Sequence, residues 1–418
     1  MKEFETIQLK KGVRLHLAPT DKFKTNYIGF TFHRPLSAKE VTVNSLLSAI
    51  IPRGCKSYPD TASLSKRFDE LYGTGMNSLV RKKGESQLIC FGFEFANEKY
   101  IGSDQHLLSD VADLAQELLF DHTPFNEEYV GQEKENLRTL IMSVFNDKRT
   151  YAQIRMIEEM CKDEAYGILD IGRIEDIPAI DGEVLYKHYK EELLSSPLDI
   201  FFMGNSPRED IVAVSERFAS FVNVKSDYPV VDVIDTVDEV KTVVQHEKVA
   251  QAKLSMGFRT GVSVENGDYY AFTVYNAIFG GGPYSRLFNN VREKMSLCYY
   301  VSSRPDRFKG IMSVNAGIEC DKFEVARDAI LEQERIVRTG EFSDEELEAA
   351  KLCLVDSLRG ISDSQRRTED FCIGQLMGGS DDGLAEYIDG IMSVTRERIV
   401  EAAKNVQLDT VYLLTKED

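Results

Sequence analysis

The chain has 418 residues, of which 43% are hydrophobic, and its formal net charge is −19. This length exceeds one ordinary domain and predicts two domains of roughly 200 residues each. The excess of acidic residues argues against nucleic acid and anionic membranes as partners, because both attract clustered lysine and arginine. An acidic chamber for basic peptides would also suit this charge, but solubility is the simpler interpretation.

Neither a membrane span nor a secretory leader is expected. The sequence has no run of about 18 apolar residues, and its beginning, MKEFETIQLKKGVRLHL, lacks the apolar core of a signal peptide. The seven cysteines are odd in number and scattered along the chain. That pattern is typical of reduced thiols, so it predicts a cytoplasmic protein rather than a disulfide-stabilised secreted one.

Four segments of the first half are echoed in the same order in the second half, roughly 210–228 residues further along. The pairs are TNYIGFTF with AKLSMGFRT, ICFGFEFANEKY with MSVNAGIECDKF, PFNEEYVGQEKENL with EFSDEELEAAKLCL, and PLDIFFM with QLDTVYLL. One such match could be chance, but four in the same order predict a duplicated domain.

Each half mixes two kinds of hydrophobic period. Stretches such as GESQLICFGFEF and GIMSVNAGIE alternate as strands do, whereas FSDEELEAAKLCLVDSL begins with a capping-box spacing at Ser343 and Glu346 and continues with helical spacing. We therefore expect an α+β fold with two homologous domains, each a mostly antiparallel sheet covered by helices on one face. The expected boundaries are 1–223 and 246–418, with a linker at 224–245.

The usual motifs of catalysis are missing. No two of the six histidines lie four residues apart, so neither HExxH nor HxxEH occurs, and no GxSxG nucleophile elbow is present. The glycine run Gly280–Gly282 lacks the GK[ST] ending of a phosphate loop. It suits a tight turn instead, or the close approach of backbone to a bound chain.

The glycine run opens a stretch that reads GGG…SRLF…VREK, followed by LCYYV. This stretch closely resembles the C-terminal half of the pitrilysin-like (insulinase-like) zinc peptidases, in their small-subunit form, which includes the mitochondrial processing peptidase. The resemblance covers essentially the whole chain. It implies two duplicated domains that form half of a clamshell chamber, and an HxxEH motif on a helix of the first domain. In that motif two histidines bind zinc and the glutamate is the general base.

This chain departs from the family at that motif. The turn that follows it survives as RGCKSYP at 53–59, and counting back places the motif on SLLSA. Ser45 and Ala49 stand where the two histidines would be, and Ser48 stands where the base would be. Serine and alanine are poor zinc ligands, and serine is no general base near neutral pH. We therefore expect no metal on this chain and expect zinc on a partner.

The family's third zinc ligand is a glutamate on a later helix. The stretch YVGQEKENLRTLI offers Glu133 and Glu135, and neither aligns clearly with that ligand. A single carboxylate would not hold zinc in water. We therefore interpret both glutamates as part of a solvated helix face.

The second domain keeps what the family uses there. The resemblance implies that Arg292 and Tyr299 point into the chamber, where the phenol would stabilise an oxyanion and the guanidinium would hold substrate carbonyls. The alternatives are a surface ion pair of Arg292 with Glu293 and ordinary strand packing of Tyr299, and Tyr300 competes for the second position. The resemblance also implies that Gly280, Gly281 and Gly282 shape the substrate channel and that peptides add as a strand to a sheet edge.

Three functions compete at this point. The first is a non-catalytic subunit of a heterodimeric zinc endopeptidase, which supplies its arginine and tyrosine to a homologous zinc-bearing partner and binds peptide substrates. The second is a pseudo-enzyme homodimer that binds peptides or acts as a scaffold. The third is a hydrolase with an unrecognised site, which nothing at SLLSA supports.

Overall fold

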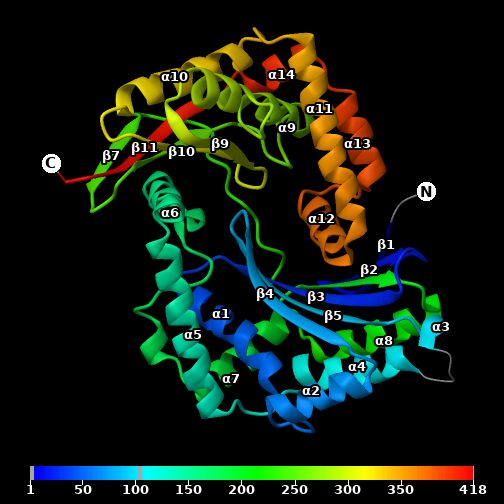
Figure 1. The fold of residues 1–418 in the computed structure, drawn as a ribbon. Helices are drawn as coiled ribbons and strands as arrows, with labels where there is room; N and C mark the ends of the chain where they lie inside the picture. The colour runs from blue at the N-terminus through cyan, green and yellow to red at the C-terminus, as the bar shows by residue number, and fades with distance from the viewer. Residues whose placement is uncertain (1–3, 102–105, 418) are drawn as a thin grey trace. The chain divides into compact units, whose positions relative to one another are not determined.

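The structure is a computed structural model that describes residues 4–101 and 106–417 (Figure 1). It contains two compact units. Unit 1 holds the chain up to Met142, Ile168–Val230 and Ser364–Ile373, whereas unit 2 holds Ser143–Gly167, Val231–Asp363 and the chain from Gly374. Each half of the sequence therefore lends one segment to the unit built mainly from the other half. We call Ser143–Gly167 the arm and Ser364–Ile373 the strap.

Unit 1 is built on a six-stranded sheet in the order β1-β2-β6-β3-β5-β4. Its strands are β1 (Glu5–Lys10), β2 (Val13–Pro19), β3 (Thr25–Pro35), β4 (Gly75–Lys83), β5 (Ser86–Ala96) and β6 (Leu198–Gly204). Neighbouring strands are antiparallel except for β2 and β6, which run parallel. The mostly antiparallel sheet expected from the sequence is confirmed.

The helices that unit 1 takes from residues 41–221 pack on one face of this sheet, as Figure 1 shows for α4 and α8. Alternate residues of β3 explain this. Phe30 and Phe32 are fully buried and contact Phe120 edge-on or tilted, and Phe30 also contacts Phe218. The helical segments are α1 (Val41–Ile50), η1 (Ile51–Arg53), α2 (Thr61–Glu70), α3 (Glu98–Ile101), α4 (Leu107–Leu119), α5 (Glu127–Asn146), η3 (Ile177–Ala179), α7 (Gly182–Glu191), η4 (Leu193–Ser195) and α8 (Arg208–Phe221).

Unit 2 repeats the plan with five strands in the order β7-β11-β8-β10-β9. These are β7 (Lys241–His246), β8 (Ala252–Arg259), β9 (Cys298–Asp306), β10 (Ile311–Ile318) and β11 (Gln407–Thr415). The helical segments are α6 (Lys148–Met160) and η2 (Ala165–Gly167) in the arm, then α9 (Tyr269–Phe279), the π-helix η5 (Leu287–Lys294), α10 (Phe323–Arg338), α11 (Asp344–Arg359), η6 (Gly360–Asp363), α13 (Leu384–Met392) and α14 (Arg396–Ala403). Helix α12 (Gln365–Met377) begins in the strap and ends in unit 2.

The internal repeat is confirmed strand by strand. The matched sequences form β3 and β8, β5 and β10, and β6 and β11, and these strands hold the same places in the two sheets. In each sheet the repeat's last strand has one parallel neighbour, which is β2 for β6 and β7 for β11. The capping box expected at Ser343 and Glu346 also forms, and it begins α11.

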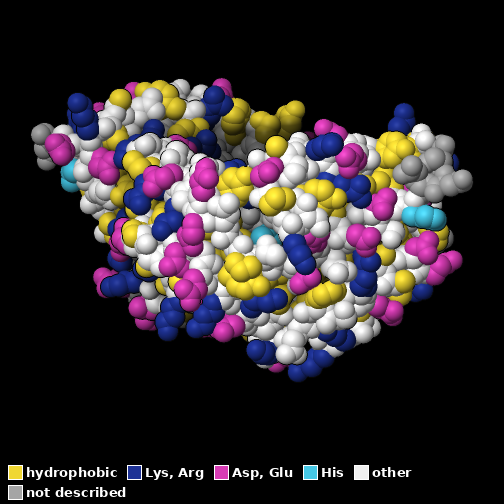
Figure 2. Space-filling model, turned by 90° about the horizontal axis from the view of Figure 1, so that it is seen from below, with side chains coloured by type: hydrophobic (Ala, Val, Ile, Leu, Met, Phe, Trp, Pro, Cys, Tyr) yellow, Lys and Arg dark blue, Asp and Glu magenta, His cyan; other side chains and the backbone are white. Residues whose placement is uncertain are grey.

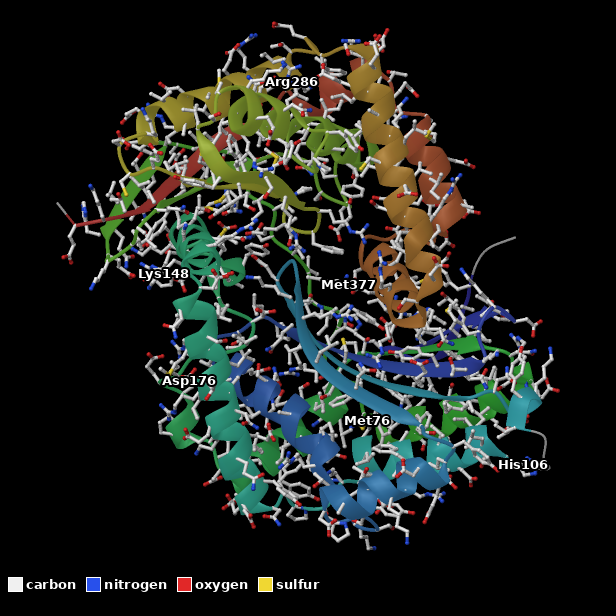
Figure 3. All side chains as sticks on the ribbon, viewed as in Figure 1. Met76, His106, Lys148, Asp176, Arg286 and Met377 are labelled. Carbon is white, nitrogen blue, oxygen red and sulfur yellow. The ribbon has the colours of Figure 1, made fainter. Side chains whose placement is uncertain are left out.

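The arm packs on the sheet of unit 2. Met156 and Met160 of α6 are buried, and a Cβ placed on Gly257 of β8 would lie only 2.6 and 2.5 Å from their sulfur atoms. At the beginning of α6, Lys148 (labelled in Figure 3) forms an ion pair with Glu247 at 2.5 Å. An apolar contact to the sheet, with an ionic contact at the helix start, therefore holds the arm in unit 2.

Figure 2 shows one face of the molecule, on which acidic and basic side chains are interspersed rather than gathered by sign. Among residues 4–101 and 106–417, no helix is both long enough and apolar enough to cross a membrane.

Candidate functional site

Helix α1 of unit 1 brings together the three residues expected at the degenerate zinc motif. Ser45, Ser48 and Ala49 share one wall of a cavity of about 370 Å³. The edge strand β4 forms a second wall through its residues 78–80, and α5 forms a third with side chains between Glu133 and Leu140. The inner leucines of the motif, Leu46 and Leu47, are buried in the core, as the sequence predicts.

The walls of this cavity do not fit a zinc ion. Its polar side chains are serine hydroxyls, one asparagine amide and the carboxylate of Glu133. Structural or catalytic zinc needs three or four nitrogen, sulfur or carboxylate ligands from the protein. Across the described part of the chain, no group of three or more histidine, cysteine, aspartate or glutamate side chains could hold a metal.

Glu133 corrects one expectation. Its side chain lines the cavity and the residue is 8% exposed, so it does not belong to a solvated helix face. The carboxylate accepts a hydrogen bond from Asn136 at 3.2 Å and lies 3.4 Å from a guanidinium nitrogen of Arg53. Glu135, two residues later on α5, is 73% exposed and follows the original interpretation. The two residues between these positions rotate the helix by about half a turn, so one glutamate points inward and the other outward.

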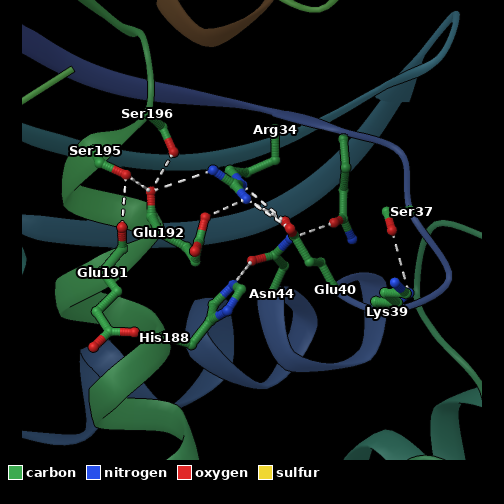
Figure 4. A network of polar contacts seen from close by, with 11 residues as sticks. Arg34, Ser37, Lys39, Glu40, Asn44, His188, Glu191, Glu192, Ser195 and Ser196 are labelled. Atoms are coloured by element: carbon green, nitrogen blue, oxygen red, sulfur yellow. Dashed lines mark hydrogen bonds and ion pairs between the residues drawn. The ribbon is translucent and has the colours of Figure 1, made fainter. Parts of the chain in front are cut away.

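A chain of buried amides fixes the position of α1 (Figure 4). Asn44, beside Ser45, is fully buried; it donates to Gln87 of β5 at 2.7 Å and accepts from His188 of α7 at 2.8 Å. Burial lowers the pKa of His188 although the nearby Glu40 raises it, so the ring is kept as a neutral donor. Gln87 in turn donates to the backbone carbonyl of Asp170 at 2.7 Å.

The start of α1 is held by charge. Arg34, at the end of β3, donates to Glu40 at 2.8 Å and to Glu192 at 2.7 Å, and Glu40 is the residue that precedes the first turn of α1. Arg34 is 5% exposed, whereas the Glu192 side chain is 43% exposed, so the guanidinium is buried and the pair with Glu192 reaches the surface. These contacts fix the position of the cavity wall that α1 forms.

The strand beside the cavity is open to pairing. β4 is the last strand of its sheet and pairs antiparallel with β5. An edge strand presents unpaired N–H and C=O groups on its outer side, and an extended peptide can add to that side as a further strand. A peptide on β4 would carry its side chains past the cavity, because Ser78, Leu79 and Val80 line both features.

In unit 2, Arg292 and Tyr299 lie close together at the surface. The Nε of Arg292 donates to the backbone carbonyl of Tyr299 at 3.1 Å, and the guanidinium lies 4.6 Å from the ring centre of Phe288. Arg292 also lies 3.4 Å from Glu293, so the surface ion pair considered for it does occur. Tyr299 is 52% exposed, so about half of the residue's surface is accessible.

A bulge in β9 determines which of the two adjacent tyrosines, Tyr299 or Tyr300, is exposed. β9 bulges where Tyr300 pairs with Gly317 and Cys298 pairs with Ile318, so Tyr299 is the extra residue. Tyr300 packs across Gly317, where a Cβ would lie 2.4 Å from its ring, and the guanidinium of Arg149 lies over the ring at 4.1 Å from its centre. Burial raises the pKa of Tyr300 to about 12. Tyr300 is a packing residue, and Tyr299 is the free one.

The three glycines play different parts. A Cβ on Gly280 would lie 2.5 Å from the hydroxyl of Ser303 and 2.8 Å from its backbone nitrogen, and the Gly280 carbonyl accepts from that nitrogen at 2.9 Å. Gly280 thus lets the end of α9 approach β9 closely. Gly281 packs against α9 itself, and a Cβ on Gly282 would meet open space. The sequence suggested that the glycines let the backbone approach a bound chain. The structure shows a close approach at Gly280, and its partner is β9 of the same chain.

This chain is similar to known proteins along nearly its whole length. Residues 179–354 match a family described as the peptidase M16 inactive domain. A Bacillus subtilis protein named "Probable inactive metalloprotease YmfF" is 35% identical over 412 residues, which cover 96% of each chain. The chain belongs to the M16 peptidase family. This confirms the family resemblance found in the sequence.

Two further proteins are similar to this chain over most of its length. A second protein of the same B. subtilis strain, "Uncharacterized zinc protease YmxG", is 22% identical over 331 residues, which cover 75% of this chain and 77% of its own. The crystal structure of a conserved protein from Enterococcus faecalis V583 superposes with a TM-score of 0.92 at 29% identity, and the match covers 99% of each chain. The α+β fold with two sheets is therefore that of a solved protein.

Sequence reasoning missed the amide chain behind α1 and the inward glutamate. Asn44 directly precedes the SLLSA segment, and a polar residue in an otherwise apolar helix was a usable signal of a buried hydrogen bond. Glu133 shares the inner side of α5 with Leu137 and Leu140, which lie four and seven residues later, and that spacing could have identified it.

Proposed function

We propose that this chain is a non-catalytic M16 subunit that binds extended peptides along β4 and supplies Arg292 and Tyr299 to the zinc site of a homologous partner. The observation that carries the proposal is the cavity at α1. The cavity is lined by helix α1 and the edge strand β4, and it is large enough for one side chain. Ser45, Ser48 and Ala49 stand in it where the family has its metal ligands and base.

The absence of catalysis by this chain alone follows from that chemistry. A zinc-bound water needs ligands that leave one position open on the metal, and a base that removes its proton. Hydroxyl and methyl groups provide neither. The name of the B. subtilis relative, a probable inactive metalloprotease, supports the same conclusion for this chain.

A zinc-bearing partner is supported by the relatives and by unit 2. One bacterial strain encodes both a probable inactive metalloprotease and a zinc protease that resemble this chain. Division of labour between two such chains would give Arg292 and Tyr299 a use, since Tyr299 is exposed and a tyrosine hydroxyl can donate to a carbonyl oxygen that gains negative charge. We place this chain in the cytoplasm, because its seven scattered cysteines are free thiols.

The cavity indicates how peptides are held. Main-chain hydrogen bonds to β4 would give affinity for any extended segment, and the cavity would admit one large side chain among Ala49, Leu79 and Leu137. Filling the space tests this. Ala49→Trp places a bulky ring in the cavity, and we expect it to weaken peptide binding more than tenfold, measured by fluorescence anisotropy of a labelled peptide.

A matched control is Val325→Trp on the exposed side of α10, where the native side chain is 56% exposed. The chain has no tryptophan of its own, so each variant also reports its folding through a single fluorophore. If Ala49→Trp folds and binds peptide as tightly as Val325→Trp does, the cavity is not the peptide site.

The partnership itself is tested by cleavage of a fluorogenic peptide of moderate length by the zinc-bearing homologue from the same cell, with and without this chain. We expect a severalfold gain in turnover when this chain is added. Tyr299→Phe should remove the gain, whereas Tyr300→Phe, one residue later and packed on Gly317, should keep it. Equal turnover by the homologue alone, with no binding of this chain, would refute the divided site.

The cavity and β4 lie within one unit, which also supports a second candidate: a homodimeric pseudo-enzyme that binds peptides or acts as a scaffold. This candidate predicts peptide binding without cleavage, a dimer of this chain in solution, and no effect of Tyr299→Phe. Sedimentation of the purified chain with and without the homologue separates the two candidates.

A further inference from the structure

The strap Ser364–Ile373 is docked on the sheet of unit 1 through polar side chains. Gln365 donates from its amide to the backbone carbonyls of Thr25 in β3 at 3.0 Å and Met203 in β6 at 3.1 Å. Its own amide oxygen accepts from the Thr25 hydroxyl at 3.1 Å. These bonds join the first residue of α12 to two central strands.

One turn later, Glu369 enters a notch in the same sheet. Gly29 of β3 and Gly92 of β5 face each other in the ladder, and a Cβ on Gly29 would lie 1.9 Å from a carboxyl oxygen of Glu369. A Cβ on Gly92 would lie 2.3 Å from the hydroxyl of Tyr27, and that hydroxyl donates to Glu369 at 2.6 Å. The notch exists because both strands carry glycine there, and Glu369 is 7% exposed inside it.

The next residue connects the strap to the edge strand. Asp370 forms ion pairs with Arg81 and with Lys83 of β4, the latter at 2.8 Å. Two basic side chains at the end of β4 are therefore held by one carboxylate of the strap. The strap therefore contacts one end of the strand that borders the α1 cavity.

Glu369 is the titratable group of this contact. The groups that face it are Tyr27 from β3, Arg81 from β4, Cys90 from β5, and Arg366 and Asp370 from the strap itself. Burial raises the pKa of Glu369 to about 7, although the Tyr27 hydrogen bond and the charge of Arg81 act in the opposite direction. Once released into water the same side chain would have a pKa of about 4.3.

The direction of the pH effect follows. Docked Glu369 holds its proton more tightly than free Glu369, so docking is favoured most at acid pH. The contribution is complete below the ordinary glutamate pKa and is lost as the pH rises through about 7.

We propose that the strap is a proton-controlled latch on the sheet of unit 1. With Glu369 protonated the strap stays docked in the glycine notch, and ionisation of Glu369 promotes its release together with the grip of Asp370 on β4. The consequence for peptide binding at β4 rests on the proposed function. The latch itself does not, because it concerns only contacts within unit 1.

Hydrogen–deuterium exchange with mass spectrometry tests the latch on the full chain. The readout is the protection factor of amides in residues 364–373, corrected for the intrinsic pH dependence of exchange, at pH 6, 7 and 8. We expect wild-type protection to fall about tenfold between pH 6 and pH 8, given the two pKa values. Glu369→Gln keeps the shape and the bond from Tyr27 but cannot ionise, so its protection should not change over this range. Glu386→Gln, an exposed glutamate of α13, is the matched control and should behave as wild type.

A second variant keeps the test decisive if Glu369→Gln folds poorly. Tyr27→Phe removes the hydroxyl that stabilises the carboxylate, so the fall in protection should move to higher pH. Wild-type protection that stays level from pH 6 to pH 8, or a fall in Glu369→Gln equal to that of wild type, overturns the latch. Peptide affinity measured at the same pH values separates the two proposals, because the strap can open with pH whether or not β4 binds peptide.

Discussion

Gly29 and Gly257 hold equivalent positions in the two repeats, but different kinds of side chain pack over them. The matched sequences TNYIGFTF and AKLSMGFRT align Gly29 with Gly257. In unit 1 a carboxyl oxygen of the strap's Glu369 fills the space over Gly29, and in unit 2 the sulfurs of Met156 and Met160 in the arm fill the space over Gly257. The duplicated fold thus keeps one device, a segment borrowed from the other half of the sequence and seated over a strand glycine.

The contacts over Gly29 and Gly257 respond differently to pH, because one is made by a carboxyl group and the other by methionine sulfurs. We call each contact a seat. Methionine contacts depend on apolar burial and are insensitive to protons. A buried carboxyl group exchanges a proton with its surroundings and transmits pH to the contact. Substitutions at paired positions of the repeats can therefore show which unit carries stability and which carries responsiveness.

We expect the largest effect from an aspartate that the repeats share. The carboxylate of Asp199 in β6 accepts hydrogen bonds at 2.7–3.1 Å from Arg14, His16, His33 and Tyr228. Asp199 is 1% exposed, and Asp199→Asn would turn an acceptor for several donors into a partial donor. We expect a loss of about 4 kcal/mol in the free energy of unfolding, measured by urea denaturation at pH 7.

The pH dependence of that effect has a defined sign. Burial alone would raise the pKa of Asp199, but the hydrogen bonds from His16 and His33 hold it well below its ordinary value. Its contribution is therefore present above the ordinary aspartate pKa of about 3.9 and is lost as the pH falls below it. The difference between wild type and Asp199→Asn should shrink in acid, and a difference that grows in acid would contradict this account.

Its counterpart in the second repeat is Asp409, from the matched sequence QLDTVYLL. Asp409 accepts from Arg259 at 3.0 Å, and Arg259 keeps a second carboxylate partner in Glu164. Asp409→Asn should therefore cost only about 1–2 kcal/mol by the same measurement. Equal losses at the two positions would show that the difference in hydrogen-bond partners does not matter.

The apolar seat comes next in size. Met156 is fully buried against the sheet of unit 2, and Met156→Ala should lower the free energy of unfolding by about 3 kcal/mol through lost burial and a residual cavity. The loss should be the same at pH 6 and pH 8, since no titratable group fills this seat. A loss that changes by more than about 1 kcal/mol between these pH values would remove the distinction between the two seats.

Much of the fold was predictable because a duplication repeats its own evidence. A strand that occurs in both repeats shows the period-2 pattern twice, so it is easier to recognise. The matches also give the order of equivalent strands along the chain. The exchange of the arm and the strap was not predictable, because a local pattern shows that α6 is a helix but not which sheet receives it. Long-range packing decides that, here through Met156 and Gly257.

The candidate site, like the fold, was only partly predictable from the sequence. The loss of the zinc ligands at Ser45, Ser48 and Ala49 can be read from residue chemistry once the following turn is recognised. The inward direction of Glu133 and the notch for Glu369 depend on contacts between segments far apart in the chain. A lone glutamate in a polar helix is solvated far more often than buried, so only the structure could identify Glu369, whereas the spacing of Glu133 with Leu137 and Leu140 was a usable signal in the sequence.

The smallest expected effect concerns the two adjacent tyrosines of β9. Tyr299 is 52% exposed at the bulge, whereas Tyr300 packs on Gly317 and under Arg149. Tyr299→Ala should change the free energy of unfolding by less than about 0.5 kcal/mol, and Tyr300→Ala should lower it by about 1–2 kcal/mol through lost packing and cation–π contact. Thermal denaturation of the two variants, with Tyr300→Phe as a control that keeps the ring, measures both. A larger loss for Tyr299→Ala than for Tyr300→Ala would reverse the register and make Tyr300 the free tyrosine of the pair.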